Sequence, residues 1–210
     1  MSGLPAEMTD RWQDRAEPAP GEGLFYWHML VGHIPEVLAL AGDARRRLAS
    51  FGGLHFTPLA WLHMTVLIAG SASEISEEQV RQMSSAAGRL LADIPPITVT
   101  VGKIVYHPEA IMLAARPVEA LQPVLEAAQK ATRAVTGSPG RPGNKLPWAP
   151  HITIAYSTAQ QSAEPIMTAL GRSLPERSVQ ISTVSLVNQR GPERSWDWQP
   201  EATVRFGTSP

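Results

Sequence analysis

The sequence contains no cysteine, which excludes disulfide bonds and thiolate metal sites. It also has no uninterrupted apolar run approaching the roughly 18 residues that a membrane-spanning helix needs. The first 22 residues carry prolines and scattered charges but no apolar core of a secretory signal. We therefore expect a cytoplasmic protein that makes no membrane contact, with a flexible N-terminal tail over residues 1–23.

A strong charge of either sign is missing as well. The chain has 18 Lys and Arg against 19 Asp and Glu, for a formal net charge of −1. Proteins that bind long nucleic acids usually neutralise many phosphates with a basic surface, so a partner of the long-duplex type is not expected. A nucleotide or a short RNA needs only a few local cations, and this balance favours such a substrate.

The chain is long enough to bury one sizeable core, with 210 residues and 43% hydrophobic content. Alternating and helical spacings predict strands and helices in this order: strand 24–31, helix 34–51, strand 62–69, a helix capped by Ser76 and Gln79, strand 97–101, strand 111–115, helix 118–135, a strand from His151, helix 163–170, and strands at 179–187 and 203–206. We expect an α+β fold in which two pseudo-symmetric lobes of mostly antiparallel sheet, with outer helices, surround a central groove. Residues 24–206 would form this single domain and residues 207–210 a C-terminal tail.

Two copies of one tetrapeptide pattern are the most informative feature of the chain. They are His63-Met64-Thr65-Val66 and His151-Ile152-Thr153-Ile154. Each copy lies in an alternating stretch, so the histidine and the threonine two positions later project from the same face of a strand. Imidazole exchanges protons near neutral pH, and a neighbouring hydroxyl can donate to a phosphoryl oxygen. A matched pair of this kind favours acid–base chemistry at a phosphodiester.

A third occurrence of the short pattern, His55-Phe56-Thr57, is an alternative to His63. Pro58 removes a backbone donor directly after it, and Gly52-Gly53 indicates a turn just before it. These neighbours disfavour a central strand, whereas His63 begins an apolar run. His63 and His151 are therefore the favoured pair, with His55 in place of His63 and buried histidines without chemistry as the other interpretations.

The tandem motif resembles that of the 2H phosphoesterase superfamily, which includes 2′-5′ RNA ligase-like proteins and RNA cyclic phosphodiesterases. The resemblance includes proline and tryptophan residues before each copy, namely Pro58 and Trp61 before the first and Pro147, Trp148 and Pro150 before the second. By order of elements, it covers residues 24–206. It implies a bilobal fold and a metal-independent reaction on a 2′,3′-cyclic phosphate or a 2′-5′ linkage, catalysed by the two histidines, reversible as ligation in some relatives and requiring no cofactor.

Several other residues are candidates to contact the substrate. Arg141 and Lys145 lie in a loop rich in glycine and proline, and Trp148 and Tyr26 are aromatic candidates near the motifs. Three further cations could also contact the substrate phosphate, although none belongs to a motif: Lys103, Arg190 and Arg194. Tyr156 should point away from the His151 face if its strand is regular.

Two other classes of function compete with this interpretation. Metal-dependent hydrolysis is disfavoured because the sequence has no His-x-His, no His-Glu-x-x-His and no carboxylate at ligand spacing beside either motif. A non-catalytic module that binds nucleotides or RNA ends on the same fold would keep the site without turnover. Measurable turnover separates this module from an enzyme. We expect the protein to act as a monomer.

Overall fold

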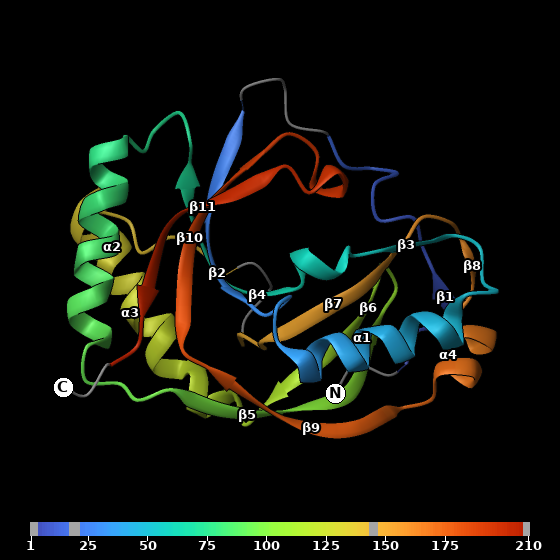
Figure 1. The fold of residues 1–210 in the computed structure, drawn as a ribbon. Helices are drawn as coiled ribbons and strands as arrows, with labels where there is room; N and C mark the ends of the chain where they lie inside the picture. Colours follow the sequence, from blue (N-terminus) through green and yellow to red (C-terminus); the bar gives the residue numbers. More distant parts are fainter. Residues whose placement is uncertain (1–3, 17–21, 143–146, 208–210) are drawn as a thin grey trace.

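Two antiparallel sheets organise the computed structural model, which describes residues 4–16, 22–142 and 147–207 (Figure 1). The first sheet has the strand order β11 (Trp198–Arg205), β10 (Thr183–Arg190), β2 (Gly23–Leu30) and β4 (His63–Ser71). The second has the order β3 (Leu54–Phe56), β7 (His151–Ser157), β6 (Ala110–Arg116), β5 (Ile97–His107) and β9 (Ser173–Ile181). The expected α+β class with mostly antiparallel sheets is confirmed. Each motif strand, β4 or β7, pairs with a strand from its own half of the chain, β2 or β6.

Four α-helices accompany the sheets in the described part of the chain, and local sequence signals mark some of their ends. They are α1 (Pro35–Leu48), α2 (Glu77–Leu91), α3 (Val118–Thr136) and α4 (Glu164–Leu170). The predicted capping box of α2 is present, because the Ser76 hydroxyl accepts from the Gln79 N–H and the Gln79 side chain accepts from the Ser76 N–H. A left-handed glycine, Gly137, ends α3, a backbone conformation that glycine adopts without steric cost.

The two connecting helices are exchanged between the lobes. Helix α1 follows β2 and lies, in the sequence, between the two adjacent strands β2 and β4 of the first sheet, yet it packs against β9 and β7 of the second sheet and against α4. Helix α3 joins β6 to β7 of the second sheet, yet it packs mainly against α2 and β4, and its Thr132 hydroxyl accepts from the Trp27 indole N–H at 3.0 Å. Figure 1 shows α2 and α3 together beside β10 and β11, and α1 and α4 together beside the second sheet.

Residues 4–16, the described part of the flexible tail that we expected over residues 1–23, are attached to the rest of the molecule. In the described part, residues 4–16, strand β1 (Glu7–Met8) pairs with β8 (Gln161–Ser162), and Met8 is fully buried. The backbone N–H of Arg11 donates to Ser157 O at 3.0 Å. We call residues 4–16 the N-terminal strap. One buried apolar side chain and this backbone pairing fix it to the second sheet, a long-range effect that composition does not reveal.

The other end of the chain is also attached where it is described. Gly207, the first residue of the expected C-terminal tail, donates its N–H to Leu91 O at the end of α2 at 3.0 Å; residues 208–210 lie outside the described part. Within the described ranges, no helix is both long and apolar enough to cross a membrane.

Candidate active site

The same irregularity interrupts both motif strands directly after the threonine. In β4, Thr65 pairs with His28 and Leu67 with Trp27, so Val66 is an extra residue. In β7, the corresponding extra residue is Ile154, between the partners of Met112 and Ile111. An extra residue of this kind is a β-bulge, and it changes which face the following side chains occupy. The repeat is therefore one of strand geometry as well as of sequence.

The bulge corrects our expectation for Tyr156. His151, Thr153 and Tyr156 pair in turn with Ala114, Met112 and Ala110, which alternate along β6 and so share one face. Tyr156 therefore lies on the His151 face instead of pointing away. Its ring is buried in a small cluster separate from the main core, and burial raises the pKa of its hydroxyl.

The first motif strand gathers a matching set of side chains. His63, Thr65 and Ile68 pair with alternate residues of β2, namely Leu30, His28 and Tyr26, so these six share a face. The Tyr26 and His28 rings stack at a centroid distance of 5.1 Å, and the His28 ring lies 4.2 Å from that of His63. Tyr26 is one of the candidates predicted from the sequence. His28, two residues further along the same strand, is buried beside both rings and carries no motif of its own.

Both motif histidines are oriented in the same way. The Nδ1 atom of His63 lies 2.7 Å from Trp61 O, and Nδ1 of His151 lies 2.7 Å from Ala149 O. A carbonyl oxygen only accepts, so Nδ1 carries the proton in each neutral ring and Nε2 is the nitrogen that can accept a proton. The carbonyl two residues upstream thus selects one tautomer at both positions.

The two imidazoles share one electrostatic environment where β4 and β7 lie side by side. Burial lowers the pKa of His63; the Trp61 carbonyl acts to raise it, the charge of His151 lowers it further, and Glu193 raises it. Burial also lowers the pKa of His151; the Ala149 carbonyl opposes this effect, while Arg11 reinforces it. Because the charge of His151 lowers the pKa of His63, a proton on one ring disfavours a proton on the other.

The two threonines are placed beside the histidines on the same faces. Thr65 and Thr153 are both half-buried. The Thr153 side chain interacts with the Tyr156 hydroxyl, and the backbone oxygen of Thr65 accepts a hydrogen bond from Trp148 Nε1 at 3.1 Å. Hydroxyls at these positions can donate to an anion held between the imidazoles.

Two tryptophan rings also lie beside His63. The Trp198 ring is edge-on to His63 at 5.6 Å and the Trp196 ring at 6.3 Å, in addition to His28. Trp196 follows the short helix η2 (Glu193–Ser195) and adopts a left-handed backbone conformation, φ 53°, which is uncommon for a residue other than glycine. Neither tryptophan was predicted from the sequence, because Trp196 lies in the turn before β11, Trp198 begins β11, and neither is near a motif in the sequence.

Of the remaining residues predicted to contact the substrate, only some lie near the motif strands. Arg141 is exposed, bridges its backbone to Ile68 and acts electrostatically on Tyr26, so it lies near the first motif strand. Trp148 is buried, 6% exposed, which fits packing better than a stacking platform. Lys145 lies outside the described residues. Lys103 is exposed on β5, Arg190 pairs with Glu201, and Arg194 is exposed on η2.

His55, the alternative to His63, occupies a different position. It lies on β3 opposite Tyr156, in the same sheet as His151, and its Nε2 is 3.2 Å from Arg194 O. His63, by contrast, reaches the site from the other sheet. His33 and His107 lie in or beside turns, as expected for surface positions.

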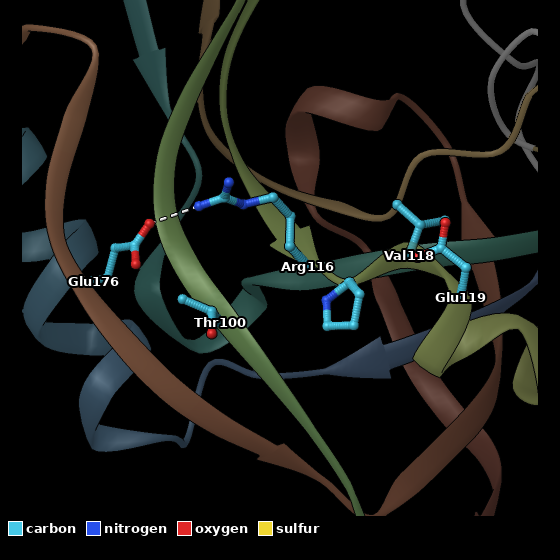
Figure 2. Close-up of a pocket in the computed structure, with 6 residues that line it drawn as sticks. Thr100, Arg116, Val118, Glu119 and Glu176 are labelled. Carbon is cyan, nitrogen blue, oxygen red and sulfur yellow. Dashed lines mark hydrogen bonds and ion pairs between the residues drawn. The ribbon is translucent and has the colours of Figure 1, made fainter.

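An open pocket elsewhere on the molecule is lined by an arginine and two glutamates instead of histidines (Figure 2). It has a volume of about 430 Å³ and is lined by Thr100, Arg116, Pro117, Val118, Glu119 and Glu176. Arg116 and Glu176 pair with each other across it at 2.6 Å. No histidine lines it, so the acid–base pair places the candidate active site at β4 and β7. Among residues 4–16, 22–142 and 147–207, no three His, Asp or Glu side chains cluster closely enough to hold a metal ion.

Known structures share this arrangement of elements. TT0787 of Thermus thermophilus superposes with a TM-score of 0.67 at 18% identity, over 89% of this chain and 100% of that one. E. coli LigT, solved in complex with 3′-AMP, gives 0.61 at 16% identity, over 90% and 100%. The MHV ns2 PDE domain gives 0.58 at 12% identity, over 81% and 99%. At these identities the likeness shows the fold.

The family follows from the sequence itself. No curated protein matches the chain. A family model described as the 2′-5′ RNA ligase superfamily, however, matches residues 35–193, well over half of the chain and including both His-x-Thr strands. With the tandem motif, the bilobal α+β fold and this match, the resemblance to the 2H phosphoesterases is confirmed, and the chain belongs to the 2′-5′ RNA ligase superfamily.

Proposed function

We propose that this protein is a metal-independent phosphodiesterase that acts on a 2′,3′-cyclic phosphate or a 2′-5′-linked nucleotide. The observation that carries the proposal is the matched geometry of His63 and His151. Each imidazole is held by a carbonyl two residues upstream at 2.7 Å, so that both use Nε2 for proton exchange. Two like imidazoles on neighbouring strands are what a reaction with one general base and one general acid requires.

The reaction on a cyclic phosphate would proceed in one displacement. One neutral imidazole takes a proton from water as the water oxygen bonds to phosphorus. The bond from phosphorus to one ribose oxygen breaks, and the other imidazole, protonated at the start, gives its proton to that oxygen. A phosphomonoester and a free hydroxyl result. Thr65 and Thr153 would donate to the non-bridging oxygens and stabilise the charge that builds there.

The substrate class draws support from the solved relatives. E. coli LigT was solved in complex with 3′-AMP, with NADP⁺ and with ATP, all of which are nucleotides. The net charge of −1 is consistent with a ligand of one or few phosphates. Tyr26 and Arg141, near the first motif strand, are the residues that we propose contact the nucleotide in addition to the catalytic four.

A panel of purified phosphodiesters tests the proposal directly. Nucleoside 2′,3′-cyclic phosphates, 2′-5′ and 3′-5′ dinucleotides, and a short RNA with a cyclic phosphate end are incubated with the protein, and products are resolved by chromatography. We expect turnover of the cyclic phosphates or of the 2′-5′ dinucleotide, unaffected by exhaustive EDTA treatment. Binding without turnover of any of these compounds would favour the non-catalytic module. Loss of turnover with EDTA that zinc or manganese restores would show a metal enzyme.

The pH dependence of kcat/KM should be bell-shaped and displaced to acidic pH. The reaction needs one neutral and one protonated imidazole, and kcat/KM reports the free enzyme. Burial lowers the pKa of both His63 and His151, so both limbs should lie below where ordinary imidazoles, with pKa about 6.5, would place them. We expect the optimum on the acidic side of neutrality and falling activity through pH 8. A profile that is flat from pH 5 to 9 would contradict proton exchange by these histidines.

A further inference from the structure

Arg11 of the N-terminal strap enters the active site from outside the segment that matches the family model, residues 35–193. Its side chain is only 18% exposed. The guanidinium donates twice to Glu193, from Nε at 2.7 Å and from Nη2 at 2.8 Å, and from Nη1 to Glu109 at 3.0 Å. It also lies over the Tyr156 ring, 4.5 Å from the centroid. One side chain thus ties the strap to three other segments.

Two of the three partners of Arg11 come from a segment next to a motif residue. Glu193 lies on η2, the turn that delivers Trp196 to His63, and Tyr156 lies on the His151 face of β7. Glu109 lies in the turn between β5 and β6 and accepts a hydrogen bond from Arg11 Nη1, which helps to fix the orientation of the guanidinium. A bidentate pair between an arginine and a carboxylate fixes direction as well as distance. The strap therefore determines where one positive and one negative charge stand relative to the two imidazoles.

We propose that Arg11 is a positioning residue of the active site, which holds Glu193 toward His63 and its own charge toward His151, so that the two chemically alike imidazoles differ in protonation. The catalytic role of Arg11 rests on the proposed function. Its effect on the protonation of the two histidines does not, because that effect can be measured without a substrate. It assigns a role in the site to a segment outside the family match.

The sign of the effect follows from the charges that face each ring. Around His151 these are Arg11, His107 and His63; around His63 they are Glu193, His151 and the buried His28. A guanidinium disfavours the imidazolium form of its neighbour, and a carboxylate favours it. Removal of Arg11 should therefore make His151 easier to protonate. It also releases Glu193 from the bidentate pair that holds it toward His63, so His63 should become harder to protonate.

The experiment is an NMR pH titration of the histidine ring signals in the full chain, assigned with His63→Ala and His151→Ala. In Arg11→Gln we expect the midpoint of His151 to rise by about 0.5 to 1 pH unit. In Glu193→Gln the midpoint of His63 should fall, while Arg11→Lys should keep the midpoint of His151 within about 0.3 pH unit of its unmutated value because the positive charge is kept. The matched control is Arg15→Gln. Arg15 lies in the same strap and pairs with the same Glu109 at 2.6 Å, but its side chain is 48% exposed.

The outcomes separate a positioning role from a structural one. An Arg11→Gln protein that folds and titrates like the unmutated chain would overturn the proposal, as would an equal change in Arg15→Gln. If Arg11→Gln does not fold, an unchanged His63 midpoint in Glu193→Gln would overturn it instead. Where the panel yields a substrate, the limb of the kcat/KM profile that belongs to His151 should move to higher pH by a similar amount in Arg11→Gln. Absence of any turnover in the unmutated protein would count against the proposed function, not against these titrations.

Discussion

Replacement of His63 or of His151 by alanine is expected to lower kcat/KM by at least about 10²-fold with the fold intact. Each substitution removes the Nε2 atom that we propose exchanges a proton with the substrate, and the remaining imidazole cannot serve as both base and acid in one displacement. The double variant should be little slower than the slower single variant, because groups that act as a unit are not additive. Rates are measured on whichever phosphodiester the panel identifies, with circular dichroism to verify folding.

Two further histidine variants make this test specific. His33 is exposed in the turn after β2 and belongs to neither motif strand, so His33→Ala should retain full activity. His55→Ala tests the alternative first motif. If His55→Ala lost activity while His63→Ala kept it, the acid–base pair would have to be assigned to β3 and β7. Full activity in either His63→Ala or His151→Ala would contradict the two-histidine mechanism.

The second large effect is expected at the threonines. Thr65→Val and Thr153→Val keep the branched shape but remove the hydroxyl, and each should lower kcat/KM by roughly 10- to 100-fold through the loss of a hydrogen bond to charge that develops at phosphorus. The pH profile should keep its shape, because neither change removes a titrating group of the reaction. The effect should fall mainly on kcat if the hydrogen bond strengthens in the transition state.

Thr98→Val is the control for this pair. Thr98 is exposed on β5, so the same chemical change should leave the rate unaltered. Wild-type rates in both Thr65→Val and Thr153→Val would remove the threonines from the site. A loss of the same size in Thr98→Val would point instead to a general effect on the sheet.

Local patterns in the sequence were sufficient to locate most elements. The strict alternation at residues 97–101 lies within β5, the capping box at Ser76 begins α2, and Gly171 follows α4 as a helix end. The expected single stretch at 179–187 is instead two strands, β9 and β10, separated at Ser182. Apolar residues continue across Ser182 while the chain passes from the second sheet into the first, and periodicity alone cannot mark a change of sheet without a glycine or proline.

The site was only partly predictable, and the missing parts have a common cause. His63, Thr65, His151 and Thr153 are visible because a repeated pattern marks them. Tyr156 was placed on the wrong face because a bulge changes the alternation without a signature in the residues themselves. Long-range contacts bring in the rest, with sequence separations as large as the 182 residues between Arg11 and Glu193. Contacts of that range depend on tertiary packing, which no local window contains.

The exchange of α1 and α3 between the lobes has a consequence for how the molecule can be divided. Any cut of the chain into its two sequence halves would separate a sheet from helices that cover it, since α1 covers strands encoded after residue 150 and α3 packs on a strand encoded before residue 72. β10 and β11, which complete the first sheet, also come from the C-terminal end. The lobes are therefore interlaced halves of one folding unit, and neither can be produced alone as a continuous fragment with its own covered core. An expression fragment or a fusion point belongs at the ends of the whole unit.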